Sequence, residues 1–508
     1  LGVGAVPLAL GAVLLLAAVL RGWGLTSKSL WYDEAFAVFV ARQPLTEMIG
    51  LLRDFDMHPP FHYVFLHVWM RLVGDGEVAV RLPGVLASVC AVLFTFLLGR
   101  RLGGTRVGVL AATLLALSPF QIAAAQEARM YPFLTLFGVA SSYALWLALE
   151  GGSRRHWIAY ALVTTLSLYT HHFTILLLLA HGAYVLGIHR LRAGGRAWLL
   201  CAVVAVAAYL PQLSVFFQQL VRARGWPSFE GPFGLGLVAD VMGLLSFGGG
   251  TFGMGTYYRG GTLALPYRVL MVLPFLWLAV RGVGKLGERQ RQAYLLAYFL
   301  VPLLLAAAIS LQWNIFQERY FSFLLPPFVM LLAAGMLAVA DRARPSARAA
   351  PLVGAVGLLS AALMTPSLLG VYRDQPSYDW RGAARHLTTA AGPSDFVHYL
   401  PSFVSIPFDY YFREDRPRLP GTPRDVLAVV FLAGQRKLSL RSGLPPEAME
   451  TASRTHPRLW LITSAALGDD VHRQIGTVLS ASFQPGEVRR FGLVRVALWK
   501  SRHYTPSP

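Results

Sequence analysis

The sequence predicts a mainly α-helical bundle that crosses a membrane many times and ends in a small C-terminal α/β domain outside the membrane. Three observations lead to this fold class. Of the 508 residues, 55% are hydrophobic and 14% are charged, whereas a soluble domain carries roughly 25% charge. Apolar runs of about 20 residues, each long enough to span a bilayer, recur along the first three quarters of the chain. The remaining part instead alternates short apolar runs with polar stretches.

The apolar runs define eleven candidate membrane spans. The first is expected to be a retained signal-anchor helix, because it is too long for a signal-peptide core and no clear cleavage site follows it. His171 and His172 interrupt one apolar run and leave two short spans on either side. The spans are 2–20, 82–99, 107–126, 130–149, 157–170, 173–188, 197–217, 263–280, 293–312, 320–340 and 350–368.

Alternate connections between these spans are short and basic. The positive-inside rule places such links in the cytoplasm. The opposite, exoplasmic face then receives the acids, histidines and aromatic residues, so we expect the functional site there. The basic links carry Arg100, Arg101 and Arg106, then Arg154 and Arg155, then Arg190, Arg192 and Arg196, then Arg281, Lys285, Arg289 and Arg291, and finally Arg342, Arg344 and Arg348.

The net charge of +19 could indicate nucleic acid or a membrane. Many of the basic residues lie in the links between apolar runs, which is the pattern that orients membrane proteins. The lipid bilayer is therefore the expected partner, and nucleic acid is not. Richness in Arg, Ala, Gly and Leu indicates a GC-rich bacterial genome, so we expect a multi-pass protein of the bacterial plasma membrane with its site facing the periplasm or exterior.

Two domains are expected. Residues 1–369 form the transmembrane domain, with a long first exoplasmic loop at about 21–81 and a Gly-rich exoplasmic loop near 218–262. Residues 370–508 form an extracytoplasmic α/β domain, because apolar runs alternate with helix-compatible segments. This tail lacks a Gly-rich phosphate fingerprint and is expected to be accessory or acceptor-facing. The expected strands are 396–400, 426–432, 459–463 and 493–499, and the helices 380–389 and 469–479.

The first exoplasmic loop begins with the acidic pair Asp33 and Glu34, beside Trp31 and Tyr32. Aromatic residues of this kind mark the membrane interface. One interpretation is an interfacial amphipathic helix whose acids face water. The other is a partly desolvated carboxylate that acts as a general base, since burial raises a carboxyl pKa towards working pH.

The same loop contains Asp56 and His58 before the double proline at 59–60, and His62 after it. The prolines stop one helix and open the next, which would hold Asp56 and His58 in place. A divalent-cation site built from Asp56, His58 and His62 is one alternative, but the spacing is not diagnostic. The favoured alternative is that His58 donates a hydrogen bond or a positive charge to an anionic ligand.

Two further exoplasmic junctions combine an acid, an arginine and a tyrosine. One holds Glu127, Arg129 and Tyr131, and the other reads Glu-Arg-Tyr at 318–320 with Arg319 and Tyr320. Charges at this depth are costly and are either paired or functional. Ion pairs are one interpretation. Arginine also suits bidentate phosphate contact, so a lipid phosphate at this depth is the other.

These motifs together resemble a known family. The resemblance is carried by the runs SLWYDEAFAVFVARQPL, HPPFHYVFLHVWMRLVGDGEVAVRLPGVL, SPFQIAAAQEARMYPFLTL and FQERYFSFLLPPF, and in the tail by YDWRGAARHL. They are similar to GT-C fold enzymes of the glycosyltransferase 39 type, which include bacterial protein mannosyltransferase-like and lipid A aminoarabinose transferase-like enzymes. The resemblance covers about residues 25–340.

The resemblance implies a sugar donor carried on a polyprenyl phosphate and an acceptor that is a glycan, a lipid or a protein. Asp33 would deprotonate the acceptor hydroxyl, and attack opposite the phosphate would invert the anomeric carbon. Arg129 and Arg319 would stabilise the departing lipid phosphate. His58 and Tyr320 would help to hold it.

Glu34 and Glu127 would orient the base or the arginines, with Asp56 and Tyr131 in support. No cofactor is assigned, and a divalent cation stays open. Two other classes compete: a lipid or polysaccharide transporter, and an inactive envelope-assembly subunit of the same fold. A transporter would need polar or broken helices at the membrane midplane, whereas the charges noted here gather at one face.

Overall fold

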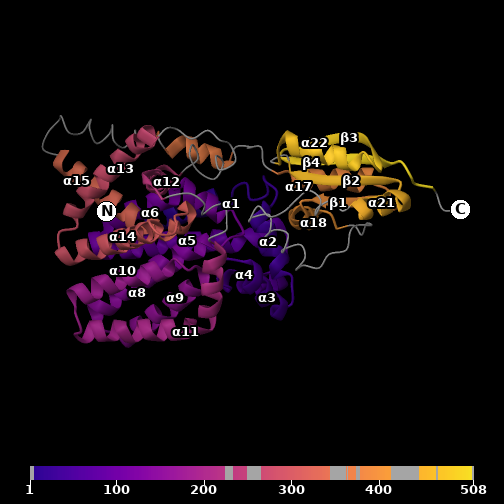
Figure 1. Ribbon diagram of the computed structural model, residues 1–508. Helices are drawn as coiled ribbons and strands as arrows, with labels where there is room; N and C mark the ends of the chain where they lie inside the picture. Colours follow the sequence, from indigo (N-terminus) through magenta and orange to yellow (C-terminus); the bar gives the residue numbers. More distant parts are fainter. Residues whose placement is uncertain are drawn as a thin grey trace. The chain divides into compact units, whose positions relative to one another are not determined.

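The computed structural model describes residues 5–223, 233–248, 265–343, 362, 364–372, 378–413, 446–464 and 467–505. The chain divides into two compact units (Figure 1). The first contains residues 1–25 and most of the chain from 57 to 373, and the second contains residues 26–56 and the C-terminal region. Each is described by itself below.

The first unit is helical. Its large core is made of leucine, alanine and aromatic side chains from helices distributed along the chain. Its helices are α1 (Ala5–Gly22), α4 (Phe61–Val73), α5 (Glu77–Gly103), α6 (Thr105–Leu117), α7 (Pro119–Ala125), α8 (Tyr131–Gly151), α9 (Arg154–Thr170), α10 (Thr174–Ile188), α11 (Ala193–Ala223), α12 (Leu235–Phe247), α13 (Leu265–Lys285), α14 (Arg289–Ser310), the 3₁₀ helix η2 (Glu318–Leu324) and α15 (Leu325–Ala343).

Six described helices are long and apolar enough to cross a membrane, or seven if the bent pair α6–α7 is one span. The predicted spans up to residue 340 all fall on helices, several of them shorter than the length a bilayer needs. Most of the predicted span 350–368 lies outside the described residues. The count of eleven spans therefore stays a prediction.

Proline and serine set the breaks between helices. Pro119 lacks an N–H and cannot continue the hydrogen bonding of α6, so the chain bends by 60° into α7. Ser118 caps the new helix by accepting a hydrogen bond from the Gln121 N–H at 3.4 Å. The double proline at 59–60 separates α3 (Leu45–Phe55) from α4, as the sequence predicts.

Arg21 donates hydrogen bonds to backbone carbonyls at the end of α6 from a buried position. Its side chain is fully buried and donates hydrogen bonds to Leu115 O at 3.0 Å, Ala116 O at 2.9 Å and Ser88 Oγ at 2.6 Å. The two carbonyls belong to the last turn of α6, where helical acceptors lack an intrahelical donor. The arginine thus ties α1 to the break between α6 and α7.

One predicted loop is helical instead. The region near 218–262 is expected to be a Gly-rich loop, but residues 235–247 form α12, whose side chains are largely buried. The apolar residues between the glycines are sufficient for a helix packed in the core. Gly248, with a φ of 85°, then ends α12 in the left-handed conformation. The glycines that follow lie outside the described residues.

The second unit contains a four-stranded sheet with the strand order β1-β2-β4-β3. β1 and β2 are parallel, while the β2–β4 and β4–β3 pairs are antiparallel. Its elements are α2 (Tyr32–Ala41), α3 (Leu45–Phe55), α17 (Trp380–Ala390), β1 (Phe396–Leu400), the 3₁₀ helix η3 (Ser402–Val404), α18 (Ser405–Tyr411), α21 (Pro446–Thr455), β2 (Arg458–Ser464), α22 (Gly468–Leu479), β3 (Phe483–Phe491) and β4 (Val494–Ser501).

Helices cover both faces of this sheet (Figure 1). α17 and α18 pack on the face that carries Trp460 and Ile462, while α21 and α22 pack on the face that carries Leu459 and Leu461. The predicted strands at 396–400, 459–463 and 493–499 and both predicted helices are present. The predicted strand 426–432 lies outside the described residues.

Residues 26–56 belong to this second unit and contact the tail within it. Tyr411 OH accepts a hydrogen bond from the Leu30 N–H at 2.7 Å. The guanidinium of Arg381 donates to Thr26 O at 3.0 Å, and the Tyr32 and Phe403 rings meet edge to face at 5.4 Å. The predicted loop 21–81 is therefore divided between the two compact units: residues 26–56 belong to the same unit as the tail, and residues from 57 onward belong to the helical unit.

Candidate active site

Five of the predicted site residues come together in the first unit. The His58 and Tyr320 ring centroids lie 5.9 Å apart, and the Tyr131 and Tyr320 rings stack at 6.3 Å. The Arg319 guanidinium carbon lies 5.6 Å from the Tyr131 ring centroid. Arg129 is buried two residues before Tyr131. We call this group, with His171, the Arg–His–Tyr cluster.

The cluster is assembled from four separate chain segments. His58 precedes α4, Arg129 lies in the turn between α7 and α8, and Arg319 lies in η2. His171 comes from the turn between α9 and α10, and its ring centroid is 4.6 Å from that of Tyr320. A binding site needs such convergence of distant segments, and the local sequence does not reveal it.

The turn that carries Arg129 is held tightly. The Arg129 N–H donates to Glu127 O at 2.8 Å, and the Arg129 guanidinium donates to Tyr63 OH at 3.4 Å. His62 Nε2 lies 3.1 Å from Ala128 O and can only donate to it. Gly84 of α5 approaches the same turn, and a Cβ there would lie 2.9 Å from Ala125 O.

A second set of polar side chains forms hydrogen bonds that reach the His58 backbone. His172 Nε2 donates to Gln219 Oε1 at 2.9 Å, since an amide oxygen only accepts. Its Nδ1 then accepts from Tyr209 OH at 2.9 Å. Gln219 Nε2 in turn donates to His58 O at 3.4 Å. This series of hydrogen bonds links the backbone at His58 to α11, which carries Tyr209 and Gln219.

The electrostatic character of the cluster is positive at His171. Burial lowers the pKa of this imidazole well below its usual value, and nearby His58, His172, Arg129 and Arg319 lower it further. Burial disfavours any charge at this position, but the nearby positive groups that disfavour an added proton also attract an anion. The cluster therefore suits an anionic ligand such as a phosphate.

The predicted acids Asp33, Glu34 and Asp56 belong to the second unit. Glu34 is buried, and its Oε2 accepts from the Trp31 N–H at 3.2 Å at the start of α2. Asp33 is the neighbouring, partly exposed residue of the same turn. Asp56 ends α3 and is buried. Among the described residues, no three His, Cys, Asp or Glu side chains form a group that could hold a metal ion.

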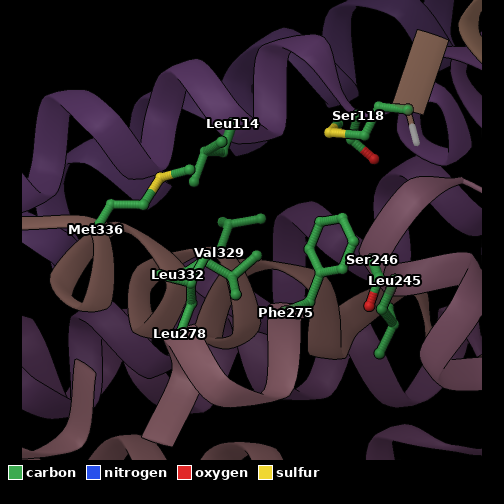
Figure 2. Close-up of a pocket in the computed structure, with 10 residues that line it drawn as sticks. Leu114, Ser118, Leu245, Ser246, Phe275, Leu278, Val329, Leu332 and Met336 are labelled. Carbon is green, nitrogen blue, oxygen red and sulfur yellow. The ribbon is translucent and has the colours of Figure 1, made fainter. Parts of the chain in front are cut away.

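An apolar pocket lies elsewhere in the first unit, between α6, α12, α13 and α15 (Figure 2). Figure 2 shows leucine, valine, methionine and phenylalanine side chains around it, with Ser118 and Ser246 at one end. A lining of this composition suits a hydrocarbon chain and not a sugar or a nucleotide.

Comparison with known proteins identifies the fold. Residues 57–214 match the family model described as dolichyl-phosphate-mannose-protein mannosyltransferase. The whole chain is similar to the structure of ArnT from Cupriavidus metallidurans bound to undecaprenyl phosphate, with a TM-score of 0.61, 15% identity and full coverage of both chains. The chain has the GT-C fold.

The oligosaccharyltransferase of Archaeoglobus fulgidus is a second similar GT-C structure, with a TM-score of 0.56, 12% identity, and coverage of 95% of this chain and 72% of that one. No curated protein sequence matches the chain. The predicted fold class and the predicted resemblance to glycosyltransferase 39-type enzymes are confirmed. With its long apolar helices, this GT-C chain is a multi-pass membrane protein.

The family match of this GT-C chain covers part of the cluster. Residues 57–214 include His58, Arg129 and His171, while Arg319 and Asp33 lie outside the matched segment. Sequence reasoning assigned no role to His171 and noted it only as an interruption of an apolar run. Two adjacent histidines at a predicted exoplasmic turn between apolar spans were the signal that could have identified it.

Proposed function

We propose that this protein transfers a sugar from a polyprenyl-phosphate donor to an acceptor at the exoplasmic face of the bacterial plasma membrane. The Arg–His–Tyr cluster is the observation that carries the proposal, because it offers two guanidiniums and aromatic rings to a phosphate. The similar ArnT structure is bound to undecaprenyl phosphate, which supports a lipid-linked donor.

The proposed reaction is an inverting displacement. The acceptor hydroxyl oxygen attacks the anomeric carbon from the side opposite the phosphate, and its proton passes to the Asp33 carboxylate. The bond between the anomeric carbon and the phosphate oxygen breaks, and its electron pair stays on the phosphate. The lipid phosphate thus changes from a diester with one negative charge to a monoester with two.

Arg129 and Arg319 would stabilise this added charge. A guanidinium 4 Å from a phosphate oxygen gains on the order of 4 kcal/mol at an intermediate dielectric. Only interactions that strengthen as the charge develops accelerate the reaction. His58 and Tyr320 would hold the phosphate, with Tyr131 stacked behind Tyr320.

The acids have distinct proposed roles. Asp33 is the base, supported by its place in the first turn of α2 and by its partial exposure. Glu34 would keep Asp33 in position, because its side chain caps the same helix through the Trp31 N–H. Glu127 would orient Arg129 from within their shared turn, and Asp56 has a supporting role at the end of α3.

The test is turnover of a defined donor by purified full-length protein in liposomes. A panel of polyprenyl-phosphate sugars is supplied with glycan, lipid and peptide acceptors, and both donor loss and product stereochemistry are recorded. We expect one donor to be consumed, and Asp33→Asn to lower turnover by about a thousandfold, since the acceptor proton then has no base. Asp470→Asn is the matched control, because Asp470 is an exposed residue of the second unit.

Three results would contradict the proposal. Equal turnover by Asp33→Asn would remove Asp33 from the role of base. Retention of configuration would exclude direct displacement. Movement of an intact lipid-linked sugar across the liposome membrane, without transfer, would favour a transporter.

A further inference from the structure

His171 is the least explained polar side chain of the Arg–His–Tyr cluster. It ends α9 with an extended backbone, and its side chain is almost completely buried. Its ring centroid lies 4.6 Å from that of Tyr320, 5.5 Å from that of His58 and 6.3 Å from that of Tyr131. The imidazole therefore lies at the centre of the cluster.

The backbone fixes which ring nitrogen of His171 carries the proton. The Phe173 N–H donates to His171 Nδ1 at 3.1 Å, so Nδ1 presents its lone pair. In a neutral imidazole the proton must then be on Nε2. The His171 ring is thus a hydrogen-bond donor at Nε2 as long as it stays uncharged.

This donor is buried and has no hydrogen-bond acceptor among the residues that the structure describes. A buried donor without an acceptor is costly, and native proteins satisfy nearly all of them. The other ring nitrogen of His171 already accepts a hydrogen bond from its own backbone turn. An acceptor supplied by a ligand would remove the cost.

The surroundings of His171 indicate the charge of that ligand. His58, His172, Arg129 and Arg319 are the ionisable groups that disfavour a proton on this ring. Tyr131 and Tyr320 contact it through their rings. Burial, together with the charged neighbours, keeps His171 a neutral donor. The two arginines also attract an anionic acceptor such as a phosphate oxygen.

We propose that His171 Nε2–H donates a hydrogen bond to a non-bridging oxygen of the lipid phosphate, beside the two guanidiniums. This inference rests on the proposed function and adds a phosphate contact to it. No proton is transferred, because the departing phosphate needs no protonation and the imidazole returns unchanged. His171 would bind donor and product alike and would strengthen its contact as the second negative charge forms.

Three substitutions separate the donor from the rest of the ring. His171→Gln places an amide N–H near the Nε2 position, whereas His171→Asn places an amide near Nδ1 and lacks the distal donor. His171→Phe keeps the aromatic packing and has no donor. Gly11→Ala is the control, because a Cβ at Gly11 has nothing within 4 Å.

The primary measurement is binding of undecaprenyl phosphate to the purified full chain in detergent, followed by donor turnover. We expect His171→Gln to bind within about threefold of wild type, and His171→Asn and His171→Phe to lose roughly tenfold or more, as for a hydrogen bond to a charged group. Thermal unfolding of each variant without ligand identifies any variant that does not fold, and the comparison of Gln with Asn then decides the question.

The outcomes distinguish the two proposals. Equal binding by wild type, His171→Asn and His171→Phe, with weaker binding by Arg129→Gln, would overturn the role of His171 and leave the proposed function standing. No lipid-phosphate binding by the wild type would overturn both. Competition by inorganic phosphate supports a phosphate contact, whereas binding of inorganic phosphate as tight as that of undecaprenyl phosphate would overturn the lipid as the ligand.

Discussion

Replacing Gly84 by alanine tests whether helix packing positions the cationic turn of the site. An added Cβ would lie 2.9 Å from Ala125 O and 3.2 Å from Glu127 O, and ordinary contact begins at 3.4 Å. Relieving the shorter contact needs a shift of about 0.5 Å. Both obstacles are backbone atoms, so the turn or α5 itself must move.

That shift is large enough to affect Arg129. Its hydrogen bond to Tyr63 OH is already 3.4 Å long, and an extra half ångström would break it. Overpacking costs about 1–3 kcal/mol of stability. Because a misplacement of about 1 Å can cost a hundredfold in rate, we expect roughly tenfold slower donor turnover in Gly84→Ala.

The assay compares donor kcat/KM and thermal unfolding of Gly84→Ala with those of Gly11→Ala. Both variants gain the same helix propensity, about 1 kcal/mol, but a Cβ at Gly11 meets nothing within 4 Å. Wild-type kcat/KM in Gly84→Ala, at normal stability, would refute the argument that α5 positions the Arg129 turn.

Three further predictions concern stability. Arg21→Met should lose about 3 kcal/mol in detergent unfolding, because the buried Ala116 O and Ser88 Oγ lose the Arg21 donor and Leu115 O keeps only the Ser118 N–H; an effect no larger than that of the exposed Arg155→Met would contradict this. Tyr411→Phe should lose about 1 kcal/mol from unfolding of the tail unit by removing the acceptor of the Leu30 N–H, and unchanged hydrogen exchange at α2 would count against it. Below about pH 6.5, His171 binds a proton in the unfolded chain but not in the folded chain, so the free energy of unfolding should decrease by up to about 1.4 kcal/mol for each unit by which the pH is lowered. His171→Gln should lack this pH dependence, and an equal slope in that variant would disprove the prediction.

Much of the architecture could be predicted from local pattern. Apolar runs of sufficient length give helices whatever their neighbours are, and the double proline fixes a break. In the tail, Phe396–Leu400 was predicted as a strand because it is a short apolar run between polar stretches, and the structure buries it on both faces. β3 was missed because it is a largely exposed strand that contains Pro485 and shifts register after it.

The site could be predicted only in part. Arg129 and Arg319 could be selected from the sequence because a charge near the membrane is costly wherever it lies, and their phosphate-binding role stays a prediction. His171 was not assigned, because its tautomer depends on one backbone N–H two residues away and its neighbours come from distant segments. Likewise, no local pattern shows that residues 26–56 group with the tail.

The grouping of residues 26–56 with the tail has a consequence for the order in which the protein matures. Thr26 and its partner Arg381 are 355 positions apart in the chain. At about 5–20 residues per second, roughly 20–70 s separate their synthesis. The helix that carries Asp33 is synthesised early, and the tail segment that it packs with is synthesised only after most of translation and membrane insertion is complete. A nascent or prematurely terminated chain would therefore hold its proposed base in an unfinished unit, and catalysis would begin only when the last part of the protein has folded.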